Sequence, residues 1–469
     1  MPQKQQTTAD ASSDPKKRRR VGFSSVDAGV EANECIKIYL VSNKEEVGAS
    51  DIFCIDPVDL NSFFDDDGKI YGYQGLKITI WISSISFHAY ADITFQNKSD
   101  GGKGITDLKS SLEKVFAETL VENKDDFLQT FSTESHFIRS IVSNGEILKH
   151  KTLDGHIKDS NSNSEVATSD VEVVRMVIGN IATGQLYSRV IPLVLLLVDG
   201  SNPIDVTDPQ WELYLLIQKN VDQQGEIQHR LLGFAALYRF YHYPESSRLR
   251  LSQILVLPIH QRKGYGSYLV EVLSNVATSE NIYDFTVEEP LDHFQHVRTC
   301  VDIKRLLAFD PIKHAINSSV LHLKQGKLLK RMVSPQFIPP PSVVEDVRKN
   351  LKINKKQFLQ CWEILIYLEL DPGEKCMSDY VKIIANRVKA DILGKESETA
   401  DKQVIDVPSS YNPDMSFVMF SSNNGEAKAV EMDSKQPNQE EQLQQLIDKR
   451  MKEIKLVAQK VSLSRVVYE

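Results

Sequence analysis

The sequence of 469 residues lacks the features that mark several large classes of protein. Its five cysteines are scattered and form no Cys-x-x-Cys pair, so neither a zinc ribbon nor a disulfide framework is indicated and a reducing compartment is expected. The longest apolar run, Ile191–Val198, is far shorter than the roughly 20 residues of a membrane span. We expect no membrane segment and no secretory signal, and we predict that this run is a buried strand.

The sequence also has fewer basic than acidic residues. Lys and Arg total 55 against 64 Asp and Glu, a net charge of −9, which argues against a protein that wraps nucleic acid over its whole surface. Hydrophobic residues at 41% and charged residues at 25% are ordinary for globular proteins, so collagen-like and wholly disordered chains are excluded. The length predicts two or three folded units, and the charge fits a basic partner.

Residues 1–33 are polar, and we predict a disordered tail there. A block of five cations, Lys16–Arg20, lies inside this tail next to a proline. Such a block at an extended terminus suits an acidic receptor groove, which favours a nuclear-import signal. A solvated charge run or a loose contact with nucleic acid is the alternative.

Hydrophobic periodicity predicts two mixed domains after the tail, over residues 34–190 and 191–300. The first is an α+β domain with the following expected elements: strands at Cys35–Val41, Leu76–Ser83 and Ser86–Phe95, and helices at Leu108–Glu122 and Asp125–Phe131. The second has these: strands at Trp211–Gln218, Leu231–Tyr241 and Leu249–Leu257, a helix after Gly266, and a short strand at Tyr283–Glu288. The fold class is therefore mixed α/β.

The rest of the chain is predicted to be a helical domain over 301–397, a linker over 398–436 and an amphipathic helix over 437–469. Asn354 and Gln357 have the spacing of a helix cap and its third residue, and Asn438 and Glu441 repeat that spacing before the last helix. The apolar stripe of the last helix comprises Leu443, Ile447, Met451, Ile454 and Ala458. This stripe docks either on the chain itself or on a partner.

The most informative segment is the turn Gln261–Gly266 (QRKGYG), between a predicted strand and a helix. Such a turn presents main-chain N–H groups and a positive helix end to a phosphate. Gly264 would let the main chain approach closely, and Arg262 and Lys263 add positive charge.

Three phosphate-binding patterns can be compared with this turn. A Walker loop places its lysine after the glycines, whereas Lys263 precedes them. A dinucleotide fingerprint needs a third glycine, where this chain has Leu269. The remaining pattern, Gln-x-x-Gly-x-Gly, resembles the pyrophosphate-binding turn of acyl-coenzyme A dependent N-acetyltransferases of the GNAT superfamily. An ordinary glycine-containing loop is the alternative reading.

Further segments narrow the resemblance. These are YGYQGLKI, LLGFAALYRFYHYPESSRLRLSQILVLPIHQRKGYGSYLVEVL, DFTVEEP and KINKKQFLQCWEIL. Together, over roughly residues 35–370, the chain resembles the catalytic subunit of the type B histone acetyltransferases. The resemblance implies a GNAT-like core between an α+β domain and a helical domain.

For the cofactor, the resemblance implies acetyl-coenzyme A as co-substrate. The implied coenzyme-binding residues are Ile254, Leu255, Val256, Gln261, Arg262, Lys263, Gly264, Tyr265 and Gly266. Glu288 matches the general base of the family, and Glu289 a neighbouring acidic position where the family more often has Asp. Adjacent strand residues point to opposite faces, so Glu288 is the preferred base. Without the family, this pair is typical of a solvated strand end.

For the acceptor, the resemblance implies the tail of newly made histone H4, with H3, and a WD-repeat histone chaperone as partner, in nucleus and cytoplasm. The implied substrate-binding residues are Asp65, Asp66, Asp67, Trp211 and Tyr238. The acidic run would contact a basic tail, and the aromatic rings would line the lysine stem. A solvated turn and buried core aromatics are the alternatives.

Three other expectations concern chemistry. The histidines show no metal-ligand spacing, so no metal is expected, and no sequence-specific contact with nucleic acid is expected. Cys300 is expected to be structural, because no recognisable Cys-His motif places a base beside it. Two other functions stay open: acetylation of another protein or of a polyamine by the same fold, and a non-catalytic histone-binding scaffold.

Overall fold

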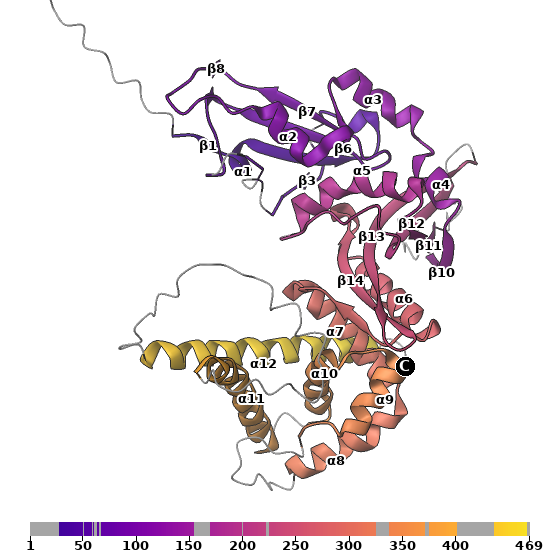
Figure 1. Ribbon diagram of the computed structural model, residues 1–469, viewed down its shortest axis with the longest axis vertical. Coiled ribbons are helices and arrows are strands. Elements are labelled where there is room, and N and C mark those ends of the chain that lie inside the picture. The colour runs from indigo at the N-terminus through magenta and orange to yellow at the C-terminus, as the bar shows by residue number, and fades with distance from the viewer. Residues whose placement is uncertain are drawn as a thin grey trace, which may run out of the picture. The chain divides into compact units, whose positions relative to one another are not determined.

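The computed structural model describes residues 28–153 (except 50, 59, 61–62 and 65–66), 169–221 (except 199), 225–324, 337–370, 375–400 and 436–466. The cationic block Lys16–Arg20 and nearly all of the predicted linker lie outside these residues. Two compact units make up the chain (Figure 1). The first contains the described part of Met1–Ser140 with Gln185–Ile204, and the second contains Ile141–Gly184 and Asp205–Glu469. The predicted domain boundaries stay predictions.

The first unit is built on a five-stranded mixed sheet with the order β3-β2-β6-β7-β9. Its strands are β2 (Ile36–Val41), β3 (Cys54–Ile55), β6 (Lys77–Ser83), β7 (Ala89–Thr94) and β9 (Leu120–Val121). Its helices before residue 140 include α1 (Ala32–Cys35), α2 (Leu108–Phe116) and α3 (Lys124–Thr133), and the short strands are β1 (Val30–Glu31), β4 (Lys69–Ile70), β5 (Tyr73–Gln74) and β8 (Asn97–Lys98). The elements β1 and α1 begin within the last residues of the predicted tail.

Helix α5 (Ile181–Leu197) corrects a prediction, because it contains all but the last residue of the apolar run that was expected to be a strand. Val190, Pro192, Leu193, Val194 and Leu196 are buried, so the second half of the helix is buried on most sides. Periodicity cannot separate such a helix from a buried strand. The Asn180 side chain accepts a hydrogen bond from the Ala182 N–H at the start of α5, a cap that was not predicted.

The second unit contains a six-stranded sheet with the order β10-β11-β12-β13-β14-β15. Its strands are β10 (Glu146–Leu153), β11 (Ser169–Val177), β12 (Trp211–Val221), β13 (Ile227–His242), β14 (Ser246–Val256) and β15 (Phe285–Val287). All neighbours are antiparallel except β14 and β15, which are parallel. Helix α4 (Phe137–Val142) precedes this sheet, and α6 (Tyr265–Ser279) packs on it through Leu269, Leu273 and Ala277. The four predicted strands of this region and the helix after Gly266 are confirmed.

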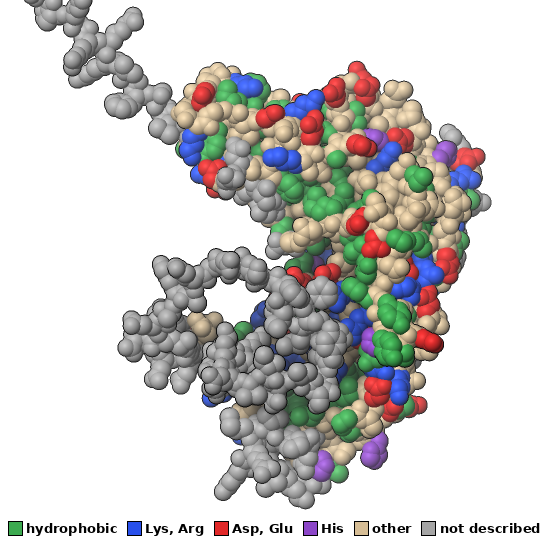
Figure 2. Space-filling model, in the orientation of Figure 1, with side chains coloured by type: hydrophobic (Ala, Val, Ile, Leu, Met, Phe, Trp, Pro, Cys, Tyr) green, Lys and Arg blue, Asp and Glu red, His purple; other side chains and the backbone are tan. Residues whose placement is uncertain are grey.

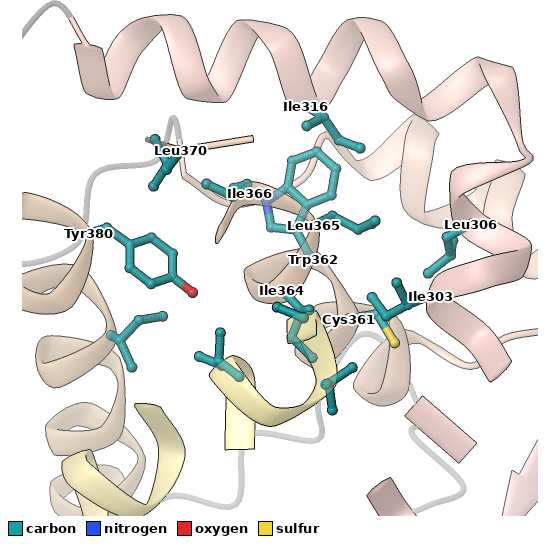
Figure 3. Packing of buried hydrophobic residues seen from close by; sticks show 14 of the residues in the cluster. Ile303, Leu306, Ile316, Cys361, Trp362, Ile364, Leu365, Ile366, Leu370 and Tyr380 are labelled. Carbon is teal, nitrogen blue, oxygen red and sulfur yellow. The ribbon is translucent and has the colours of Figure 1, made fainter. Parts of the chain in front are cut away.

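The same unit ends in helices around one apolar cluster. They are α7 (Asp292–Leu307), α8 (Lys313–Lys324), α9 (Pro341–Leu351), α10 (Lys355–Leu368), α11 (Lys375–Ala400) and α12 (Gln436–Val466). The indole of Trp362 lies inside the cluster near Ile316 (Figure 3), and its N–H donates to the Phe337 carbonyl at 2.7 Å. The predicted cap is confirmed, since Asn354 accepts from the Gln357 N–H at 2.9 Å.

The last helix docks on this cluster rather than leaving its stripe bare. Ile447, Met451, Ile454 and Ala458 are buried there. The helix begins at Gln436, so the predicted cap at Asn438 is wrong.

No helix of the described residues is long and apolar enough to cross a membrane. Acidic and basic side chains are interspersed on the face of the first unit that Figure 2 shows.

Candidate active site

The strands β14 and β15 part near their carboxyl ends. Their parallel pairing covers Leu249–Leu251 of β14, and the Glu288 N–H makes the last bond, to the Leu251 carbonyl at 2.9 Å. On its other edge, β14 stays paired with β13 as far as Val256. Among the described strands, none pairs with the β15-facing edge of β14 beyond Leu251. This edge is therefore open to an extended ligand.

The alternation of the antiparallel ladder identifies the groups on this open edge. The Leu257 N–H donates to the Leu232 carbonyl at 2.9 Å, so Leu257 and Leu255 direct their main chain toward β13. The main-chain N–H and C=O groups of Ile254 and Val256 therefore point to the open edge. Of the three predicted residues, Leu255 has a buried side chain and faces β13, so the structure does not place its main chain at the cleft.

The predicted turn follows this strand directly. After the short helix η4 (Pro258–His260), Gln261 donates from Nε2 to the Val256 carbonyl at 2.9 Å, which fastens the turn to the end of β14. Gly264 has φ 84° and precedes α6 in the left-handed conformation that favours glycine. A Cβ there would meet no atom within 4 Å, so the space in front of the turn is open.

The start of α6 can bind an anion. Its first N–H groups have no acceptor within the helix, and no side chain caps them at Gly264. The helix dipole adds positive potential, and the exposed Arg262 and Lys263 add charge. Tyr265 and Gly266 form the first turn of this helix. The predicted residues Gln261–Gly266 therefore lie together at the start of α6, and their binding of a coenzyme stays a prediction.

His260, which the sequence did not mark as functional, directly precedes the turn. Its side chain is buried, and its Nε2 atom has no hydrogen-bond partner. Burial, with the nearby cations Lys263 and Arg230, lowers the pKa of His260 to about 4. The imidazole is therefore neutral at pH 7.

The predicted carboxylates follow β15 without interruption. Ser252 donates from Oγ to Oε2 of Glu288 at 2.6 Å, across the point where the strands part. Glu289 is exposed and has φ 34°, so the chain turns sharply after Glu288. The nearby Asp284 is buried against Arg248 in a bidentate pair and is engaged structurally. Sequence reasoning missed Ser252, because no motif marks it.

The two predicted aromatic residues lie side by side. Trp211 and Tyr238 pair directly across β12 and β13, with ring centroids 5.0 Å apart. Phe240 extends the row at 4.5 Å from Tyr238, and the Arg250 guanidinium lies 4.7 Å from the Phe240 ring. A hydrogen bond with Asp208 raises the pKa of Tyr238, which keeps its phenol protonated. The rings are half-buried rather than core residues.

The acidic run is only partly described. Asp65 and Asp66 lie outside the described residues, and Asp67 belongs to the first unit. Asp67 accepts a hydrogen bond from the Tyr71 hydroxyl and pairs with Lys103 at 3.5 Å. The hydrogen bond from Tyr71 lowers the pKa of Asp67. Its carboxylate is therefore charged but already has partners in the chain.

Cys300 has a basic neighbour that the sequence did not reveal. The Nε2 atom of His296 lies 3.7 Å from its sulfur, one helical turn away. Burial raises the pKa of Cys300, so the thiol stays protonated at pH 7, and its structural role stays a prediction. No group of three or more His, Cys, Asp or Glu is arranged for a metal ion among the described residues. That the protein needs no metal stays a prediction.

Comparison with known proteins agrees with this geometry. Residues 28–199 match the family described as histone acetyl transferase HAT1 N-terminus, and residues 203–295 match the acetyltransferase (GNAT) family. The GNAT family uses acetyl-coenzyme A. The second match contains β12–β15 and the turn.

Two curated relatives cover nearly the whole chain. The histone acetyltransferase type B catalytic subunit of Arabidopsis thaliana is 61% identical over 466 residues, 99% of either chain. The subunit of the same name from Zea mays is 49% identical over 465 residues, 98% of this chain and 96% of its own. With both family matches in order and this identity over its full length, the chain belongs to the type B histone acetyltransferase catalytic subunits and is an acetyltransferase.

Proposed function

We propose that this acetyltransferase transfers the acetyl group of acetyl-coenzyme A directly to lysine ε-amines in the tail of newly made histone H4, in company with H3. One observation carries the proposal. The open edge of β14 beyond Leu251 lies between an anion-binding turn and a carboxylate, Glu288. The histone named in its relatives, and the aromatic row on β12 and β13, support the acceptor.

The coenzyme fits this edge by simple chemistry. Its diphosphate would lie on the N–H groups after Gly264, with Arg262 and Lys263 nearby. Its amide-containing arm would pair as an extra strand with the main chain of Ile254 and Val256. That pairing would aim the thioester carbonyl into the gap between β14 and β15, where a main-chain N–H can stabilise the developing oxyanion.

Glu288 would act as general base. A lysine amine has a pKa near 10.4, so at pH 7 only about one molecule in a thousand or fewer is unprotonated. Glu288 removes the proton, the amine nitrogen bonds to the acetyl carbon, and the carbon–sulfur bond breaks. The departing sulfur then takes up a proton as free thiol. Glu289 would add negative charge beside the incoming cation.

The acceptor groove would use the aromatic row. Trp211 and Tyr238 present half-buried rings that suit an aliphatic lysine stem, and a cation near their faces is favoured. Asp67, with its neighbours Asp65 and Asp66, would attract the basic flanks of the tail, provided that the tail displaces Lys103 from Asp67.

Two further parts of the proposal concern the cell. A nuclear role fits the family. We include a WD-repeat histone chaperone as partner, and a division between nucleus and cytoplasm, because newly made histones are met before deposition. The cation block Lys16–Arg20 would serve nuclear import.

The test is transfer of labelled acetyl to free histone H4, intact nucleosomes and spermidine. We expect labelling of free H4. Glu288→Gln should lower turnover roughly 100-fold at neutral pH with coenzyme binding nearly unchanged, the usual scale for loss of a general base. Labelling of spermidine without H4 would refute the acceptor, and full turnover of Glu288→Gln would remove it as the base.

A further inference from the structure

Strand β14 contains one extra residue at the place where it leaves β15. Leu251 pairs with Leu237 of β13, and Gln253 pairs with the next residue, Ala236. Ser252 therefore has no partner on β13, which defines a β-bulge.

The bulge changes which side chains face the core. Leu249 and Leu251, two residues apart, pack on the cluster beneath α6, and Ile254 packs on the same cluster three residues further on. A regular strand would have sent Ile254 to the opposite face. The extra residue thus preserves the core and leaves Ser252 half-buried at the point of divergence.

The Ser252 hydroxyl has a defined use at this point. It donates to Oε2 of Glu288 at 2.6 Å, the short length typical of a hydrogen bond to a carboxylate. We propose that Ser252 is a positioning residue: the bulge orients its hydroxyl to hold one oxygen of Glu288, so that the other oxygen faces the incoming amine. This inference rests on the proposed role of Glu288 as general base.

The Glu288 side chain needs this hydrogen bond because the main chain around it restrains it only weakly. It is exposed, it follows the last residue of the three-residue strand β15, and Glu289 after it has a positive φ. Its N–H is fixed on Leu251, but its side chain has three rotatable bonds. If the carboxylate moves about 1 Å from its productive position, the reaction rate can fall strongly, because proton transfer requires hydrogen-bond distance.

Besides Glu288→Gln, the test compares four variants of the full-length protein with core histones and acetyl-coenzyme A. Ser252→Ala should lower kcat about tenfold and leave both KM values within about twofold, the range for a hydrogen bond to a charged group. Ser252→Thr, which keeps a hydroxyl, should recover most of kcat. Ser279→Ala, which removes a serine hydroxyl bonded to the Val276 carbonyl on α6, is the matched control and should retain full kcat.

The fourth variant joins Ser252→Ala with Glu288→Gln. If the serine acts through the carboxylate, adding Ser252→Ala to Glu288→Gln should change kcat less than twofold. The inference is overturned if Ser252→Ala retains full kcat, if Thr and Ala are equally slow, or if the two losses multiply. In those cases a slow Glu288→Gln still supports the proposed base, whereas a fully active Glu288→Gln overturns both.

Discussion

Replacement of His260 by phenylalanine tests the environment of the coenzyme turn. The ring is buried, with 8% of its surface exposed, and its Nε2 atom has no hydrogen-bond partner, so an apolar ring of similar size loses little there. Burial, followed by Lys263 and Arg230, lowers the pKa from 6.5 to about 4. His260 is therefore a group that the fold holds neutral.

The sign of the effect follows from where the proton binds better. The unfolded chain takes up the proton near pH 6.5, and the folded chain only near pH 4, so protonation favours unfolding between these values. The stability that depends on neutral His260 is complete above pH 6.5 and is lost as the pH falls toward 4. The difference between a pKa of 6.5 in the unfolded chain and about 4 in the folded chain corresponds to about 3 kcal/mol in the free energy of unfolding.

Urea unfolding of wild type and His260→Phe between pH 7.5 and about 4 measures this loss. At pH 7 and above, the two proteins should differ little. Toward pH 4, wild type should lose about 3 kcal/mol more than the variant. Lys263→Gln should show a smaller acid loss than wild type, because one of the two nearby cations is gone. Parallel pH profiles for wild type and His260→Phe would refute the reasoning.

Three further predictions concern separate parts of the second unit. Gly264→Val should weaken binding of the coenzyme, measured by calorimetry, because φ 84° disfavours a branched residue by about 1–2 kcal/mol. Arg450→Met should destabilise the protein by about 2 kcal/mol in urea, because it takes a partner at 2.6 Å from the buried carboxylate of Glu363, which keeps its pair with Arg387; no loss would contradict this. Asn354→Ala should lower the free energy of unfolding in urea by about 1 kcal/mol, because the N-terminal cap of α10 is lost. An unchanged urea midpoint would contradict this prediction.

Local sequence signals predicted much of the second unit. Strands β12 to β14 have apolar residues along their length and turn residues at their ends, a pattern that predicts strands. Two glycines after a strand predict the turn before α6. The strand prediction for Ile191–Val198 was wrong, because eight consecutive apolar residues show neither helical nor strand periodicity. The helix that contains most of this run is buried on most sides. Asn180 shows that a capping signal upstream would have favoured the helix.

The candidate site was less predictable, because its key features are set between strands. The bulge at Ser252 exists only through the register of β14 on β13, and the divergence of β14 from β15 is a property of the pair. Neither leaves a mark in a single sequence. His296 beside Cys300 is a similar case, since spacing of four residues becomes contact only if the segment is helical.

The short strand that precedes Glu288 depends on the helices that follow it. Strand β15 has three residues, too few to fix its own position by pairing with β14 alone. The Phe285 N–H donates to the Lys352 carbonyl at 2.8 Å, and Arg298 donates to the Phe285 carbonyl at 3.3 Å. Arg348 of α9 donates to the Tyr283 carbonyl at 2.9 Å and lies 3.9 Å from its ring. Because these bonds come from α7, α9 and the residue after α9, the helical cluster of Figure 3 supports the strand that carries the base. A change that loosens this cluster should therefore lower acetyl transfer before it alters the coenzyme turn.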